Sequence, residues 1–177
     1  MMNSNWLSTL LSVLLLFAIA LAAADEPVAA TTLIRAQDRK LAPNFTLQDS
    51  SGKTAELRNY DGRVVVLDFW ATWCTGCKQE IPWFSEYQKI YGRLGLSIVG
   101  VAMDDGGWKV VKPYLSAHQI PYRMLIGDDA VAKQYGIQNL PDTFIIDRHG
   151  RIAAAYQARL VDRDQLEAII KKLLSEK

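Results

Sequence analysis

The sequence predicts an α/β domain in which helices flank one central mixed sheet. Two apolar runs, Val64–Trp70 and Leu96–Met103, are typical of strands that are buried on both faces. Stretches with apolar residues at helical spacing alternate with such strands along the chain. Half of the 177 residues are hydrophobic, so the chain can bury a core of ordinary size, and its length suits one domain with additional segments.

Residues 1–24 predict a signal peptide. The apolar run Leu14–Leu21 serves as its hydrophobic region, and Ala22–Ala24 offers a small-residue cleavage site. No charged side chain precedes Asp25, so an uncleaved N-terminal membrane anchor is the alternative. In both cases we expect a periplasmic or otherwise extracytoplasmic protein, whose membrane contact, if the segment is uncleaved, is made through residues 1–24 only.

The next segments predict a linker and a β-hairpin. Residues 25–40 show neither helical nor strand periodicity, which leaves residues 41–177 for the domain. Leu41–Leu47 and Lys53–Leu57 each alternate apolar and polar residues, and the turn residues Asp49–Gly52 separate them. We therefore expect a hairpin before the first buried strand.

The segment after Cys77 predicts a helix, which Pro82 should kink. The elements that follow are a strand, a helix, a strand, a helix and an antiparallel pair of strands, expected at Leu96–Met103, Trp108–His118, Tyr122–Ile126, Asp129–Tyr135, Thr143–Asp147 and Arg151–Tyr156. The last helix should begin at Asp162, with Gln165 reaching back to complete a capping box. Its buried stripe consists of Leu166, Ile169, Ile170, Leu173 and Leu174.

Both cysteines of the chain, Cys74 and Cys77, lie where the first buried strand leads into a helix. A helix N-terminus has unpaired N–H groups and a partial positive charge, which favour a thiolate. We expect Cys74 to have an exposed sulfur and to attack, and Cys77, one turn further in, to be more buried and to resolve the mixed disulfide. Thr75 and Gly76 between them affect the relative stability of dithiol and disulfide. The pattern predicts a thiol–disulfide oxidoreductase with a redox-active disulfide.

Three alternatives use the same cysteines. An inert bridge is disfavoured because so short a loop adds little stability. A metal site lacks ligands, since His118 and His149 have no second ligand at helical spacing, so we expect no metal and no cofactor. A copper or haem-assembly chaperone would use Cys74 and Cys77 as soft ligands.

The formal net charge of +1 gives no reason to expect a nucleic-acid partner.

Two carboxylates are further candidates for catalysis. Asp68 lies in the middle of the apolar run, where burial favours the neutral acid, and it could accept the proton of Cys77 during resolution. The alternative is that Asp68 reaches the surface at the end of the strand. Glu80 lies one helical turn after Cys77 and either points back toward the cysteines or is an ordinary solvated charge.

Three segments carry a resemblance to a known family. Phe69–Cys77 resembles the active-site segment of the thioredoxin superfamily and, more narrowly, of the exported thiol–disulfide oxidoreductases of the TlpA/ResA type. Ala42–Leu47 is similar to their N-terminal hairpin, and Leu140–Asp147 to their segment with the cis-proline. The resemblance covers residue 41 to the C-terminus in the same order.

The resemblance implies a thioredoxin fold with an N-terminal hairpin and with an extra strand and helix inserted between Leu96 and Gly127. It implies that Pro141 is cis and faces the cysteines, that the Leu140 backbone pairs with an extended substrate segment, and that Glu80 is the active-site glutamate. The substrate-binding residues would be Trp73, Thr75, Gly76, Leu140 and Pro141.

The resemblance also implies partners and an activity. It suggests a reductase of protein disulfides, with apocytochrome c as a substrate before haem attachment and a membrane electron-donating reductase as the partner that recharges it. An antioxidant thiol peroxidase is the third hypothesis, but Ala71 stands where such enzymes need Thr. Three residues depart from the family pattern: Gly76 replaces the usual Pro, Asp68 the usual Asn, and Leu140 a smaller or β-branched residue.

Overall fold

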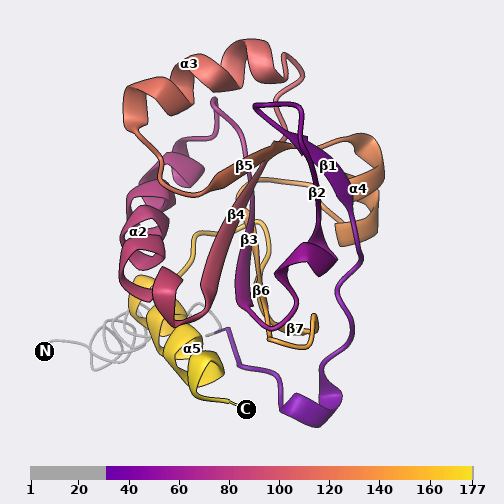
Figure 1. The fold of residues 1–177 in the computed structure, drawn as a ribbon, viewed down its shortest axis with the longest axis vertical. Helices are drawn as coiled ribbons and strands as arrows, with labels where there is room; N and C mark the ends of the chain where they lie inside the picture. Colours follow the sequence, from indigo (N-terminus) through magenta and orange to yellow (C-terminus); the bar gives the residue numbers. More distant parts are fainter. Residues whose placement is uncertain (1–30, 177) are drawn as a thin grey trace, which may run out of the picture. The chain divides into compact units, whose positions relative to one another are not determined.

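The computed structural model describes residues 31–176, which contain one seven-stranded mixed sheet (Figure 1). The strand order is β2-β1-β5-β4-β3-β6-β7. The strands are β1 (Thr46–Asp49), β2 (Thr54–Glu56), β3 (Val64–Trp70), β4 (Leu96–Ala102), β5 (Arg123–Ile126), β6 (Asp142–Ile146) and β7 (Ile152–Tyr156). The predicted mixed sheet is confirmed.

Helices connect these strands. The α-helices are α2 (Thr75–Tyr91), α3 (Trp108–His118), α4 (Asp129–Tyr135) and α5 (Arg163–Ser175), and the 3₁₀ turns are η1 (Ala36–Asp38), η2 (Leu57–Tyr60) and η3 (Gly92–Leu94). The bounds expected for α3, α4 and β3 are confirmed. β1 begins five residues after the expected Leu41 and ends two residues after the expected Leu47, and the bounds of the other strands differ from the expected ones by one residue. β1 and β2 form the predicted hairpin, with Leu47 opposite Ala55.

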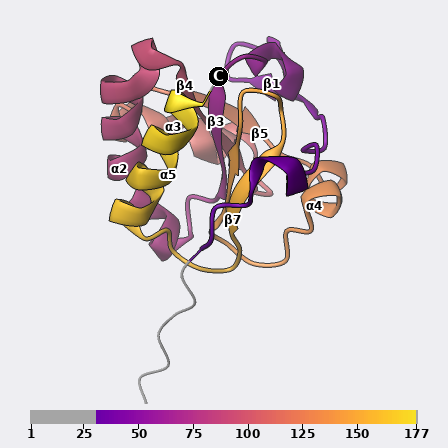
Figure 2. The same cartoon turned by 90° about the horizontal axis from the view of Figure 1, so that it is seen from below.

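The central strand β3 has a buried core on each face. It pairs in parallel with β4 and antiparallel with β6, and all seven of its residues are buried. Since side chains alternate along a strand, Val66 and Trp70 pack under α2, α3 and α5, whereas Val65 and Phe69 pack on the side of α4. Figures 1 and 2 show α2 and α5 on one face of the sheet and α4 on the other.

The predicted N-terminal cap of α5 is confirmed in part. Asp162 is the N-cap residue and accepts a hydrogen bond from the Gln165 backbone N–H at 2.9 Å. The expected hydrogen bond from the Gln165 side chain back to the Asp162 backbone is absent within the described residues. That side chain instead accepts hydrogen bonds from the Thr31 backbone N–H and the Tyr156 hydroxyl, because tertiary neighbours occupy it.

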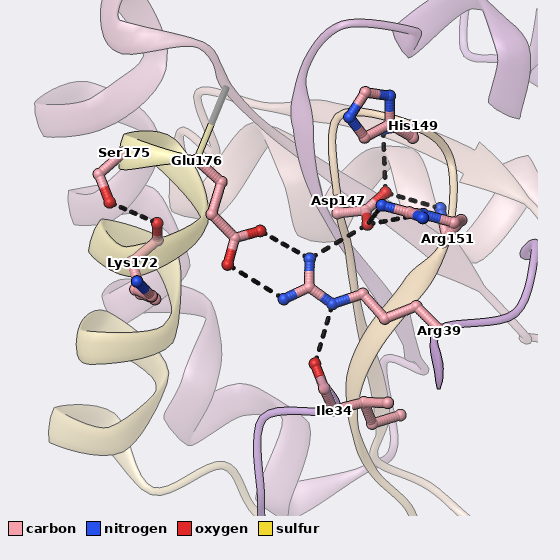
Figure 3. A network of polar contacts seen from close by, with 8 residues as sticks. All are labelled: Ile34, Arg39, Asp147, His149, Arg151, Lys172, Ser175 and Glu176. Atoms are coloured by element: carbon pink, nitrogen blue, oxygen red, sulfur yellow. Dashed lines mark hydrogen bonds and ion pairs between the residues drawn. The ribbon is translucent and has the colours of Figure 1, made fainter. Parts of the chain in front are cut away.

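Residues 31–40 differ from the predicted loose linker. Ile34 donates its backbone N–H to the Ala153 carbonyl in β7 at 2.8 Å. The Arg39 side chain is only 2% exposed, and its guanidinium bridges Asp147 at 3.2 Å and Glu176 at 2.7 Å (Figure 3). This ion pair joins the N-terminal part of the described chain to the residue after α5.

The predicted signal peptide or anchor, residues 1–24, lies outside the described residues. Within residues 31–176, no helix has both the length and the apolar character needed to cross a bilayer.

Candidate active site

The connection between β3 and α2 carries both cysteines. β3 ends at Trp70, and Cys74 is the N-cap residue of α2. Cys74 and Cys77 form a disulfide with an S–S bond of 2.05 Å and a Cα–Cα distance of 5.4 Å. The two residues that the sequence singles out are therefore joined at the N-terminus of the helix.

The backbone of α2 stabilises negative charge on Cys74. The Cys77 backbone N–H donates to the Cys74 Sγ at 3.1 Å, and the positive end of the helix acts on the same atom. Cys77 is fully buried and Cys74 is 5% exposed. The order of burial is as expected, and Cys74 as a whole residue is largely buried in the oxidised form.

The loop that precedes Cys74 is fixed from β4. The Asp104 carboxylate, just after β4, accepts hydrogen bonds from the Thr72 backbone N–H at 3.0 Å and from the Thr72 hydroxyl. The Cys74 backbone N–H donates to the Ala71 carbonyl at 3.1 Å. Trp73, between these anchors and next to Cys74 in the chain, is 67% exposed.

Asp68 is fully buried under α2. It alternates in β3 with Val66 and Trp70, which pack on that face, and it lies opposite Thr143 of β6. No hydrogen bond of normal geometry reaches either carboxylate oxygen from residues 31–176. Burial raises the pKa of the Asp68 carboxyl well above its ordinary value, the Glu80 charge raises it further, and the Thr143 hydroxyl opposes both effects only in part. The alternative of a surface position is wrong.

Glu80 is also buried, so the alternative of a solvated charge is wrong. Its Oε1 accepts a hydrogen bond from the Val161 backbone N–H at 2.6 Å, while its Oε2 has no partner within the described chain. Burial raises the pKa of Glu80 to about 7, and the Val161 N–H opposes the rise. Two buried carboxyls with raised pKa values thus lie in β3 and α2, the elements that the cysteine motif connects.

Comparison with known proteins gives the family. The model of the AhpC/TSA family matches residues 39–155. A thiol-disulfide oxidoreductase ResA from Bacillus thuringiensis subsp. konkukian is 32% identical over 135 residues, which cover 76% of this chain and 77% of that protein. The chain belongs to the AhpC/TSA family. Its relatives are thiol–disulfide oxidoreductases, and this chain is a redox enzyme of that class.

Solved structures agree on the fold. A thiol:disulfide interchange protein DsbE from Chlorobium tepidum is 30% identical, with a TM-score of 0.71, and the match covers 81% of this chain and 100% of that one. A thioredoxin family protein from Chlorobium tepidum TLS, 24% identical, has a TM-score of 0.70 and covers 77% of this chain and 97% of its own. The thioredoxin fold implied by the sequence is confirmed.

The segment that the AhpC/TSA family model matches also contains Pro141, beside the cysteines. The Leu140–Pro141 peptide bond is cis, as the resemblance implies. Pro141 Cδ lies 3.4 Å from the position that a Cβ on Gly76 would take. Thr75 is exposed, and Gly76 and Leu140 are half-buried. Thr75, Gly76, Leu140 and the exposed Trp73 thus reach the surface next to the cysteines, whereas Pro141 is buried.

Sequence reasoning missed four residues of this oxidoreductase's site. They are Asp104, which fixes the loop; Tyr122 and Thr143, whose buried hydroxyls lack hydrogen bonds within residues 31–176; and Leu160, which lies over Gly76. Burial raises the pKa of Tyr122, and the Asp68 charge adds to the effect. Only Asp104 had a local signal, since it follows the predicted second strand at the same end of the sheet as the cysteines.

Metal ligands are scarce around the cysteine pair. In the part of the chain that the structure describes, no group of three or more His, Cys, Asp or Glu side chains could hold a metal ion. Glu80 and Asp68 have the roles described above, as buried acids.

Proposed function

We propose that this enzyme reduces protein disulfides outside the cytoplasm. The Cys74 thiolate attacks a substrate disulfide, forms a mixed disulfide and releases one substrate thiolate. The Cys77 thiolate then attacks the Cys74 sulfur, which forms the Cys74–Cys77 disulfide and releases the second substrate thiolate. Two electrons pass from the dithiol to the substrate.

One observation carries this proposal: the Cys74–Cys77 disulfide lies at the N-terminus of α2, and buried carboxyls lie in β3 and α2, the elements that the cysteine motif connects. The helix end favours the attacking thiolate. A relative named thiol-disulfide oxidoreductase and a neighbour named thiol:disulfide interchange protein support exchange with disulfides.

Asp68 and Glu80 act, in this proposal, during the second step. Cys77 must lose its proton before it can attack, and Asp68 in its ionised form would accept that proton inside the protein. Glu80, whose charge raises the pKa of Asp68, adjusts how readily Asp68 takes the proton up. Trp73, Thr75, Gly76, Leu140 and Pro141 form the surface for the substrate.

The proposed partners follow the family resemblance. Apocytochrome c before haem attachment is the proposed substrate, and a membrane electron-donating reductase restores the dithiol. Residues 1–24 direct the chain across the membrane, as a signal peptide or as an anchor. Each of these needs its own test.

The test is a redox titration of the purified protein in graded thiol/disulfide buffers, followed by trapping of free cysteines. We expect a reversible two-electron couple near the potential of thioredoxin, about −270 mV. A strongly oxidising value would point to disulfide formation instead. Failure of the cysteines to form a disulfide would favour the metallochaperone alternative, and Cys74→Ser is the control that must abolish titration.

A further inference from the structure

The loop between β7 and α5, residues 157–161, is attached to the active site at two points. The Ala158 backbone N–H donates to the Asp142 carboxylate, and the Val161 backbone N–H donates to the Glu80 Oε1 at 2.6 Å. Asp142 directly follows Pro141, and Glu80 lies three residues after Cys77. The loop is therefore held by the same two elements that carry the site.

Within this loop, Leu160 is the side chain that faces the cysteine motif. Its Cδ2 lies 3.0 Å from the position that a Cβ on Gly76 would take. The neighbouring Arg159 is directed elsewhere, because its guanidinium lies 5.2 Å from the centre of the Tyr156 ring and donates to the Thr31 hydroxyl. The loop consequently presents an apolar group beside the disulfide.

The Leu160 side chain lies in the space that a side chain at position 76 would need. A separation of 3.0 Å is tighter than nine in ten real contacts of a Cβ atom, so a side chain at position 76 would require the end of Leu160 to move by a few tenths of an ångström. Leu160 is nevertheless 41% exposed, and Trp73 is 67% exposed. Two large apolar side chains from different elements thus remain open to solvent at the site.

We propose that Leu160 is a specificity-determining residue that occupies the space over Gly76 and contacts the substrate residue beside the attacked cysteine. The preferred substrates are extended polypeptides with an apolar side chain next to that cysteine, because such a side chain would cover Leu160 and Trp73 together. This inference rests on the proposed reduction of protein disulfides and names the substrate class for it.

The first experiment compares two peptide disulfides that differ only in Leu or Asn beside the cysteine, with a small non-peptide disulfide as a third substrate. Full-length wild-type protein should reduce the Leu peptide about fivefold faster at equal concentration. Leu160→Ala should remove most of that preference, measured as the ratio of the rates for the Leu and Asn peptides, with the rate for the small disulfide measured beside it for each protein. Leu94→Ala is the matched control, because Leu94 is an exposed leucine in η3, next to the start of β3 rather than its end.

The outcomes separate the two proposals. If wild type reduces the small disulfide and both peptides at equal rates, or if Leu160→Ala keeps the preference, the role of Leu160 is wrong and the reductase proposal stands. If wild type reduces no disulfide at all, both proposals are wrong.

A second experiment tests the steric part without peptides. Gly76→Ala should be better tolerated in the Leu160→Ala background than in the wild-type background, judged by the thermal unfolding midpoint of the oxidised protein, so the two changes are not additive. Additive effects would show that Leu160 does not fill the space over Gly76.

Discussion

At the scale of single residues, the unusual feature is a pair of buried carboxyls in β3 and α2, the elements that the cysteine motif connects. Sequence alone predicted that Asp68 is buried, because a charged residue interrupts an otherwise apolar strand. It left Glu80 undecided, since helical spacing does not say which face of α2 is covered. The Glu80 carboxylate is covered by Val161, which lies 81 residues further along the chain and donates its backbone N–H to Glu80. Such long-range contacts leave no local pattern.

Asp68→Asn tests the proposed proton acceptor. An amide cannot take the proton of Cys77, so resolution of a mixed disulfide should slow about a hundredfold. Rapid-quench measurement of a preformed Cys74–peptide mixed disulfide gives this rate. The first step, measured in a Cys77→Ser background, should proceed at the same rate with and without the Asp68→Asn change; an unchanged resolution rate would remove Asp68 from the mechanism.

Glu80→Gln tests the pH dependence of stability. The pKa of Glu80 is about 7 in the folded protein and near its ordinary 4.5 when unfolded, so the unfolded state releases the proton first. The free energy of unfolding of the oxidised wild type should therefore fall as pH rises from 4.5 to 7, by at most about 3 kcal/mol from this group. Asp68 acts in the same direction.

The Glu80→Gln variant should lose the part of that slope that Glu80 contributes and keep the part from Asp68, as followed by denaturant titration at several pH values. Glu86→Gln is the control, since Glu86 is exposed and pairs with Arg163 on the surface. A slope that persists unchanged in the Glu80→Gln variant would contradict the effect of burial on Glu80.

At the scale of elements, periodicity predicted nearly all strands and helices. Buried strands such as β3 and β4 are recognisable because both faces are apolar, and α4 because Gly136 ends it in a left-handed conformation, with φ of 69°. The shapes of the loops were harder to predict from the sequence. Residues 71–74 and 157–161 have no regular pattern, and their shapes depend on Asp104, Asp142 and Glu80 in other elements.

Asp104→Ala tests how the loop before α2 is held. Removing the carboxylate leaves the Thr72 backbone N–H without its partner, which should lower the free energy of unfolding by about 2 kcal/mol. Hydrogen exchange of the Thr72 amide should become faster. Asp105→Ala, at the exposed neighbouring position, should change neither quantity; protection of Thr72 that survives the Asp104→Ala change would contradict this account.

At the scale of the whole molecule, the sequence predicted the sheet but placed the start of the domain too late. The segment 31–40 contains no periodicity, so its sequence predicts a linker. Its attachment depends on Arg39, whose partners Asp147 and Glu176 lie 108 and 137 residues further along the chain. An ion pair of this kind is visible only once both ends of the chain are folded.

Arg39→Met measures what this attachment contributes. It leaves the buried Asp147 with Arg151 as its one ionic partner among residues 31–176, so the free energy of unfolding should fall by about 3 kcal/mol in denaturant titration. Arg35→Met is the matched control, because the Arg35–Asp38 pair is exposed and its loss should cost less than about 0.5 kcal/mol. Equal effects of the two changes would mean that Arg39 is not a structural anchor.

The segment before β1 also protects the sheet from other chains. β7 is the last strand of the sheet, and an open strand edge is a template for pairing with another molecule. Here the Ala153 carbonyl accepts a hydrogen bond from the Ile34 N–H, and the Ile152 N–H donates to the Lys40 carbonyl. Leu41 also forms an isolated antiparallel β-bridge with Arg151. A chain shortened to residue 41 would keep both cysteines and lose much of this cover, so the residues that guard against aggregation are ones that no reading of the catalytic motif would retain.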